Sequence, residues 1–253
     1  MTDLQQRTPA WHKARAGKLT ASNLAAYLGL NRYCSRNEAY ARLRGIKTFE
    51  GNSATQWGCD NEQNGINAYQ TRTGYVVQPT GIWTHPANMW LAGSPDGLVG
   101  EEGMIEVKCP FFKKQPHTEI PVYYYVQMNA CLEITGRKWC DYVCWTPEAG
   151  TTMFRVNRDS VLFDFLLPYW GQIYSASQRG VKDCPPLAAE HAAKIRERVE
   201  GSMKECIDYT YFDRGPDEPD SPPCISTLDE EEFFSVSAPD EPLSPPTKRQ
   251  REQ

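Results

Sequence analysis

Long apolar runs and paired cysteine motifs are absent from this sequence of 253 residues. No apolar segment approaches the roughly 18 residues that a membrane-spanning helix needs, so no such helix is expected. The first residues, MTDLQQRTPAWHKARAG, contain no apolar core of a signal peptide. We therefore expect an intracellular protein that does not act at a membrane.

Metal sites built on cysteine are not indicated either. The nine cysteines include no C-x-x-C pair, and Cys140 and Cys144 lie four positions apart in a strand-like stretch. Zinc or an iron–sulfur cluster would need two such pairs or mixed cysteine–histidine clusters. Because the count is also odd, we expect reduced and mostly buried thiols.

The net charge of −5 comes from one end of the chain. Residues 212–253 hold 11 of the 32 acidic and 4 of the 27 basic residues, which leaves 23 basic against 21 acidic residues in 1–211. The body of the protein could therefore present a basic surface to a polyanion, despite its acidic average.

The C-terminal segment differs from the body in composition. It is rich in Pro, Asp, Glu and Ser, has few large apolar residues, and is predicted to be disordered. Its patch LDEEEFF could contact a partner or simply stay solvated. The basic cluster KRQRE near the end resembles a nuclear import signal. We predict a globular domain over 1–211 and a disordered tail over 212–253.

Helix and strand patterns alternate along the body, which predicts an α/β fold with a central mixed β-sheet flanked by helices. Ser35, Glu38 three residues later and Gly45 indicate one helix with a capping box and a glycine stop. A kink is expected at Pro168. The predicted helices are 35–45, 52–74, 121–135, 159–177 and 187–205, and the predicted strands are 75–85, 88–99, 104–110, 138–147 and 151–158.

The stretch AGSPDGLVGEEGMIEVKCP, residues 92–110, concentrates charge in a hairpin-like segment. Glu106 and Lys108 lie two apart in a strand, so they share one face about 6.6 Å apart along the strand. An odd number of loop residues would place Asp96 opposite Glu106 on that face. An even number would turn Asp96 away unless a bulge corrected the parity.

Two adjacent carboxylates repel each other unless a cation lies between them. Two acids, a backbone carbonyl and waters suit Mg²⁺ or Mn²⁺, and Lys108 could hold a water or stabilise transition-state charge. Such a site suits phosphodiester hydrolysis. The alternative is a solvated hairpin, since Glu-x-Lys and Asp-Gly are common. The apolar residues Met104, Ile105 and Val107 favour a buried strand whose charges have a function.

The motifs SPDG and EVKCP together resemble the core of PD-(D/E)XK nucleases, in the branch of lambda exonuclease and YqaJ-type viral recombinases. Three further segments resemble this branch in the same order, over roughly residues 10–180. They are AWHKARAGKLTAS at 10–22, WGCDNE at 57–62 and YYYVQMNACLEITGRKWCDYVCW at 123–145.

The resemblance implies a role for each residue that matches. Asp96, Glu106 and the carbonyl of Val107 would bind the metal, and Glu62 would add an acid from its helix. Lys108 would orient or activate the attacking water. On spacing alone, Glu62 could equally be a solvated helix residue.

The other matching residues would contact the nucleic acid. Gln127 would line the site, with Tyr123 one helical turn before it. Arg15 and Ser22 would bind a terminal phosphate, and Lys18 and Thr20 lie with them at an expected helix start. The alternatives are a surface cation for Arg15, a simple N-cap for Ser22, a polar helix residue for Gln127 and a core or rim aromatic for Tyr123.

The resemblance implies a Mg²⁺-dependent deoxyribonuclease, and specifically a 5′→3′ exonuclease on double-stranded DNA ends. It would leave 3′ single strands for viral or phage recombination, with a single-strand annealing protein as partner, in host cytoplasm or nucleus. A ring-shaped trimer is possible. The alternatives are an endonuclease or an RNA-cleaving shutoff nuclease on the same scaffold, with loops 31–34 and after Pro110 choosing the substrate. A catalytically silent DNA-binding protein is a third hypothesis.

Overall fold

A six-stranded mixed sheet forms the centre of the protein. The computed structural model describes residues 4–48, 51–111 and 115–213. Strands β6 and β7 run parallel, whereas the other neighbours pair antiparallel, which confirms the predicted fold class. The strand order is β2 (Val77–Gln78), β5 (Gly97–Val99), β6 (Gly103–Lys108), β7 (Trp139–Thr146), β8 (Gly150–Asn157) and β9 (Ile207–Asp213).

A smaller second sheet has the order β1 (Leu19–Thr20), β4 (Leu91–Gly93) and β3 (Trp83–Thr84). The predicted strands 75–85 and 88–99 were therefore each wrong as single strands, because each divides between the two sheets. Pro79 and Pro95 lie at the two divisions. Proline cannot donate a ladder hydrogen bond, so it ends the pairing at these positions.

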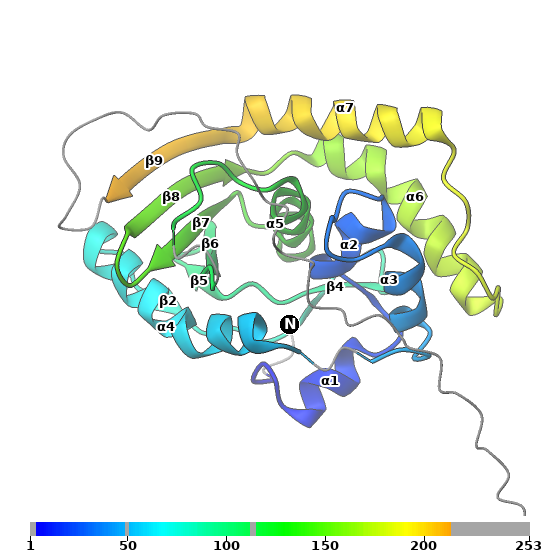
Figure 1. The fold of residues 1–253 in the computed structure, drawn as a ribbon, viewed down its shortest axis with the longest axis horizontal. Coiled ribbons are helices and arrows are strands. Elements are labelled where there is room, and N and C mark those ends of the chain that lie inside the picture. The colour runs from blue at the N-terminus through cyan, green and yellow to red at the C-terminus, as the bar shows by residue number, and fades with distance from the viewer. Residues whose placement is uncertain (1–3, 49–50, 112–114, 214–253) are drawn as a thin grey trace, which may run out of the picture. The chain divides into compact units, whose positions relative to one another are not determined.

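Helices cover both faces of the six-stranded sheet (Figure 1). Local capping explains several boundaries: the Ser35 side chain accepts from the Glu38 N–H, and Gly45 has φ +68°. The helix that contains Pro168 continues through it. The helices are α1 (Pro9–Arg15), α2 (Ala21–Tyr27), α3 (Arg36–Leu43), α4 (Ser53–Thr73), α5 (Val122–Thr135), α6 (Ser160–Gln178) and α7 (Ala189–Cys206).

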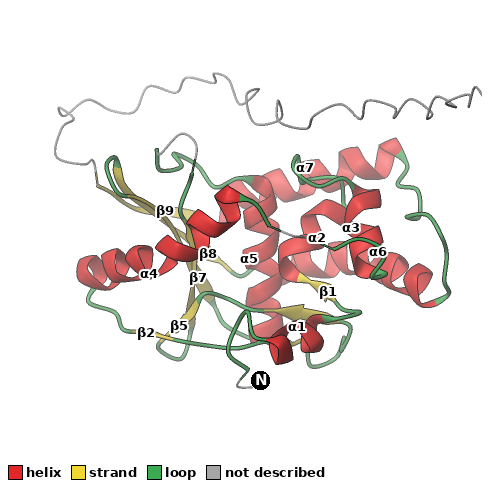
Figure 2. Cartoon of the chain, turned by 60° about the horizontal axis from the view of Figure 1, so that its bottom comes forward, coloured by secondary structure: helices red, strands yellow, loops and turns green. Residues whose placement is uncertain are grey.

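Two apolar clusters show which helix covers which face. Met104 of β6 packs in the cluster that includes residues of α2, α5, α6 and α7. Ile105 and Val107 pack in the other cluster, with Ile66 and Tyr69 of α4. The sheet thus lies between α4 and α5, as Figure 2 also shows. Glu106 and Lys108 alternate with Ile105 and Val107, so they point to the face that α5 covers.

Gly65 allows α4 to cross β6 closely. A Cβ atom at this position would lie 2.4 Å from Cγ1 of Val107, which is too close for any side chain. Glycine is unfavourable inside a helix, yet α4 runs through both Gly58 and Gly65. At Gly65 the glycine is needed for packing, and this packing brings α4 against the strand that carries Glu106.

The C-terminal part differs from the prediction in one respect. Strand β9 was not predicted, and it extends to Asp213, past the proposed domain end at 211. Residues 214–253, including the KRQRE cluster, lie outside the described residues, so the disordered tail stays a prediction. The eight cysteines within the described residues are all free. Within the same residues, no helix has the length and apolar character to span a membrane.

Candidate active site

The β5–β6 hairpin places Asp96 against Glu106. Its register pairs Gly97 with Ile105 and Val99 with Gly103, so the loop between the strands has an odd number of residues. Extending this register by one residue puts Asp96 opposite Glu106. The backbone contacts agree, since the Asp96 N–H donates to the Ile105 carbonyl at 3.1 Å. The Asp96 carboxylate accepts from the Val107 N–H at 2.7 Å. Of the two cases that the sequence left open, the structure therefore has the odd loop, with Asp96 opposite Glu106.

Glu106 is a fully buried carboxylate with one engaged and one unengaged oxygen. Its Oε1 accepts from Lys108 Nζ and, at 2.6 Å, from Gln127 Nε2 on α5. Its Oε2 is buried and receives no hydrogen bond from any residue that the structure describes. A buried acceptor without a partner is costly, so this oxygen is suited to a cation.

The electrostatics of the site favour an added positive charge. Burial and the neighbouring Asp96 raise the pKa of Glu106 to about 7, against the opposing effect of Lys108. Burial by itself would lower the pKa of Lys108, but Glu106 and Asp96 raise it above its usual value. Lys108 is therefore a protonated donor, which suits it to hold a water or stabilise negative charge rather than to remove a proton.

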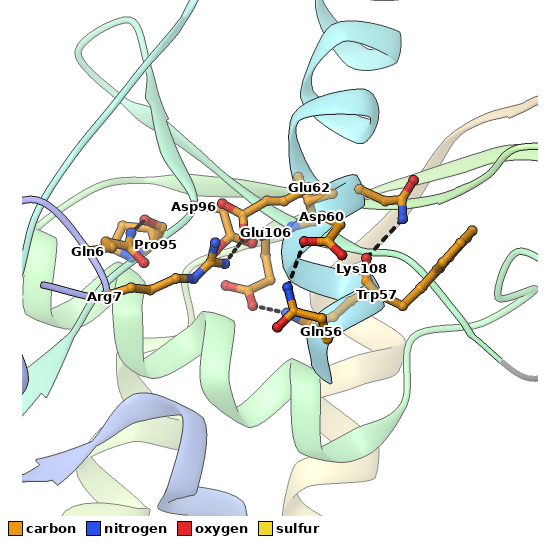
Figure 3. Close-up of polar contacts among 12 residues, drawn as sticks. Gln6, Arg7, Gln56, Trp57, Asp60, Glu62, Pro95, Asp96, Glu106 and Lys108 are labelled. Carbon is orange, nitrogen blue, oxygen red and sulfur yellow. Dashed lines mark hydrogen bonds and ion pairs between the residues drawn. The ribbon is translucent and has the colours of Figure 1, made fainter. Parts of the chain in front are cut away.

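Glu62 adds a third carboxylate from α4 (Figure 3). Burial and the charge of Asp96 raise the pKa of Glu62, whereas its ion pair with Arg7 opposes the shift. No three His, Cys, Asp or Glu side chains among the described residues lie close enough to enclose an ion by themselves. The side chains of Asp96 and Glu106 and the carbonyl of Val107 are all oxygen donors, the set that Mg²⁺ accepts when waters complete its shell.

Arg15, the last residue of α1, forms a second cluster with Trp11 and Ser22. The guanidinium lies over the Trp11 ring, 4.1 Å from its centroid, and Nη2 donates to Ser22 Oγ at 3.4 Å. Burial lowers the pKa of Arg15 to about 10, and no described acidic residue pairs with it. A partly buried guanidinium without an acidic partner is well suited to bind a phosphate.

Of the other residues predicted to bind phosphate with Arg15, one lies in this cluster and one does not. Thr20 Oγ1 lies 3.4 Å from Ser22 Oγ, so Thr20 joins it. Lys18 does not, because its Nζ donates to the Met89 carbonyl at 2.5 Å. The N-cap of α2 is Thr20, and it makes no side-chain capping bond. Ser22 is the second residue of the helix, so its interpretation as a simple N-cap was wrong.

The cluster of Arg15, Trp11 and Ser22 is hydrogen-bonded to the loop that carries Asp96. Trp11 Nε1 donates to Ser94 Oγ at 3.0 Å, and Ser94 lies two residues before Asp96. The same Trp11 ring supports Arg15. A group bound at Arg15 and a group bound at Asp96 would therefore be held by one connected unit.

A family model, described as the YqaJ-like viral recombinase domain, matches residues 10–138. The chain belongs to this family. A mimivirus protein from Acanthamoeba polyphaga mimivirus, "Uncharacterized protein R354", is 24% identical over 160 residues, which are 55% of this chain and 29% of that protein. This YqaJ-like chain thus spans under a third of the length of the curated relative that it matches.

Two solved structures of one alkaline exonuclease, LHK-Exo from Laribacter hongkongensis, share the fold. One is 29% identical to this chain, with a TM-score of 0.56. The matched region covers 79% of this chain and 100% of the exonuclease chain. The other, a complex with dAMP, is 28% identical with a TM-score of 0.57 and the same coverage. Family and neighbours together support a nuclease activity for the YqaJ-like chain.

Tyr124, rather than Tyr123, contacts the central lysine of the YqaJ-like site. Lys108 Nζ lies 4.9 Å from the Tyr124 ring centroid. The Tyr123 ring packs against the Tyr124 ring, with centroids 4.4 Å apart, and against the Tyr33 ring, with centroids 5.7 Å apart. Tyr124 is therefore the tyrosine next to Lys108, and Tyr123 packs on Tyr124. The i, i+3 spacing of Tyr124 and Gln127 could have indicated that both lie on one helix face.

Three other residues near the site were missed by the sequence analysis. Trp11 and Ser94 belong to segments that matched the family, but nothing in their spacing showed that they bond to each other. Arg7 precedes every matched segment. Its contact with Glu62 joins positions 55 residues apart, so no local pattern could predict it.

Proposed function

We propose that this YqaJ-like chain is a Mg²⁺-dependent exonuclease that degrades double-stranded DNA from its ends in the 5′→3′ direction. The observation that carries the proposal is the Trp11–Ser94 hydrogen bond, which joins the Arg15 cluster to the Asp96 loop. A terminal phosphate held at Arg15 would fix the next phosphodiester near Asp96. Such positioning is a large part of the catalysis of phosphoryl transfer. The dAMP bound by the related exonuclease supports DNA as the substrate class.

The metal proposal rests on the unpartnered Oε2 of Glu106. Asp96, Glu106 and the carbonyl of Val107 would hold the ion directly, and Glu62 would reach it through water. Bound Mg²⁺, or Mn²⁺ in its place, would supply Lewis-acid chemistry and an activated water at the scissile phosphate.

The protein's own residues have separate parts in this proposal. Lys108 donates to Glu106 and would place its positive charge where the phosphate becomes more negative during attack. Gln127 fixes the orientation of Glu106. Arg15 and Ser22 would bind the terminal phosphate, with Thr20 beside Ser22.

The wider setting is also proposed rather than established. Digestion from 5′ ends would leave 3′ single strands for viral recombination or genome processing, and a single-strand annealing protein would be the partner that uses them. DNA binding should weaken with salt, because phosphate contacts release counterions. A trimer would let one assembly stay on the duplex while it degrades one strand.

The test is digestion of a linear duplex that carries a label at either the 5′ or the 3′ ends. A covalently closed circle and a single-stranded RNA serve as other substrates, each with Mg²⁺ or with EDTA. We expect Mg²⁺-dependent loss of the 5′ label from the linear duplex alone. Lys108→Ala should lower the rate by about 10²–10³-fold, while Lys138→Ala, at a surface pair with Glu102, should not.

Other results would redirect the assignment. Cutting of the circle would indicate an endonuclease, and cutting of the RNA would indicate a ribonuclease, on the same residues. Early loss of the 3′ label would show that digestion runs in the 3′→5′ direction instead. A chain that binds DNA but cuts none of the substrates would contradict a nuclease function altogether.

A further inference from the structure

Gln6 and Arg7 connect the two elements that carry Asp96 and Glu62. Gln6 Nε2 donates to the carbonyl of Pro95, directly before Asp96, at 2.8 Å. Arg7 Nη2 forms an ion pair and hydrogen bond with Glu62 Oε2 (Figure 3). Two consecutive side chains thus contact both the Asp96 loop and helix α4. Their segment continues into α1, whose N-cap is Thr8.

The backbone of Arg7 has a positive φ, a conformation that is unfavourable for any residue except glycine. Its φ is +67°, and every other residue with positive φ in the described ranges is a glycine. A left-handed conformation costs a non-glycine residue about 1–2 kcal/mol. Such strain persists only where the surrounding contacts impose it, and it concentrates at functional sites.

The stability of the ion pair does not explain this strain. Half of the Arg7 side chain is exposed, at 50%. The Glu62 side chain is 24% exposed, so solvent reaches both partners, and a pair screened by solvent contributes about 0–1 kcal/mol, which does not exceed the backbone cost. A glycine at position 7 would avoid that cost. The arrangement therefore points to a purpose for the guanidinium other than folding stability.

The three carboxylates of the site share one pattern of hydrogen bonding. One oxygen of each is engaged: Asp96 Oδ2 by the Val107 N–H, Glu106 Oε1 by Lys108 and Gln127, and Glu62 Oε2 by Arg7. The second oxygen of each accepts no hydrogen bond from any residue that the structure describes. Donors that hold one oxygen of a carboxylate fix the direction in which the other points. Arg7 does for Glu62 what Gln127 does for Glu106.

We propose that Arg7 is a positioning residue of the metal site. It holds the Glu62 carboxylate in place, so that the second oxygen is available to the waters around the bound ion. Gln6 sets the position of Arg7 by attaching the segment to the Asp96 loop. The inference deepens the proposed function and rests on it, because it concerns the same ion.

The test measures Mn²⁺ binding directly, by the electron paramagnetic resonance signal of the free ion, on the full chain. Arg7→Gly is the main variant, because glycine adopts φ +67° without strain and lacks only the side chain. We expect Mn²⁺ affinity to fall by about 10-fold or more, with an unchanged or higher melting temperature. Nuclease activity should return at higher Mn²⁺ concentrations, with kcat largely recovered.

Further variants exclude simpler explanations. Arg158→Ala removes an arginine from another arginine–glutamate pair, with Glu133 at 3.7 Å, and should leave Mn²⁺ affinity unchanged. Glu62→Gln should weaken binding as Arg7→Gly does. The double variant should then bind Mn²⁺ no more weakly than Glu62→Gln alone, because both substitutions remove the same interaction between Arg7 and Glu62. This comparison remains informative if Arg7→Gly lowers stability, and Arg7→Gln provides a second replacement.

Each contrary result has a defined meaning. Unchanged Mn²⁺ affinity in Arg7→Gly would overturn the inference, and tighter binding would show instead that the guanidinium competes with the ion. Additive losses in the double variant would also overturn it. If the unaltered chain binds no Mn²⁺, the metal-dependent function itself fails, which is distinguishable from failure of the Arg7 inference alone.

Discussion

Gln127 on α5 and Lys108 on β6 donate to the same oxygen of Glu106, so the carboxylate is held from two directions. Its other oxygen is buried and accepts a hydrogen bond from neither donor. This relationship fixes the rotamer of a fully buried acid before any cation arrives. The orientation of Glu106, more than its presence, is therefore what the surrounding residues secure.

Gln127→Leu should lower nuclease activity while the chain stays folded. The side-chain volume is similar, but the Glu106 carboxylate loses one of its two donors. Outer-shell partners of this kind typically contribute about 10–100-fold in metal affinity or activity. Activity measured against Mg²⁺ concentration should show a higher requirement for the metal. An unchanged metal requirement would mean that Lys108 alone orients Glu106.

Gly65→Ala should lower both stability and activity. The new Cβ would lie 2.4 Å from Val107 Cγ1, so α4 would have to move away from β6 and take Glu62 with it. Overpacking of this kind costs about 1–3 kcal/mol. Gly58→Ala, in the same helix and with nothing within 4 Å of its Cβ, is the matched control. It should be neutral or stabilising by about 0.5–1 kcal/mol. Thermal unfolding and nuclease assays distinguish the two, and equal effects would contradict the close packing of α4 on β6.

Without metal, the protein should become less stable as pH rises from about 5 to 8. Burial and Asp96 raise the pKa of Glu106 from 4.5 to about 7, so the folded state holds this proton more tightly than the unfolded chain. The resulting stability is fully present below the unfolded pKa and is lost as pH rises through the folded one. We expect a loss on the order of 2 kcal/mol, or roughly 4–8 °C in melting temperature.

The measurement is thermal unfolding in EDTA and in Mn²⁺ across this pH range. Mn²⁺ binds the ionised carboxylate, so its stabilising effect should grow with pH. Glu106→Gln should have a flatter pH profile in EDTA, whatever its absolute stability. A wild-type profile that does not fall between pH 5 and 8 in EDTA would show that folding does not raise the pKa of Glu106.

Arg15→Ala should remove the preference for a terminal phosphate. The guanidinium lies over the Trp11 ring and has no acidic partner among the described residues, so a bound phosphate would be its main counter-charge. We expect KM for 5′-phosphorylated duplex to rise by about 10-fold or more, as for loss of a charge-assisted hydrogen bond, with little change for 5′-hydroxyl ends. Lys18→Ala is the control, since that ammonium is bonded to the Met89 carbonyl. Equal losses on both kinds of end would assign Arg15 to general DNA binding.

Local sequence determined the part of the site that lies within one hairpin. The parity of the turn after Val99 puts Asp96 opposite Glu106, and the period of the strand puts Lys108 beside Glu106. Helix caps such as Ser35 and Gly45 were predictable for the same reason. These features depend on residues a few positions apart, whose geometry the backbone fixes.

The tertiary structure decided which residues from other elements pack against this hairpin. Glu62 and Gln127 reach it from helices on opposite faces of the sheet, and the prediction of either role required family resemblance. Arg7, Tyr124 and the Trp11–Ser94 bond became visible only in the fold, as did the division of the strands 75–85 and 88–99 between two sheets. Such contacts form between residues tens of positions apart. They depend on how whole elements pack, as at Gly65 and Val107, which no local pattern of residues specifies.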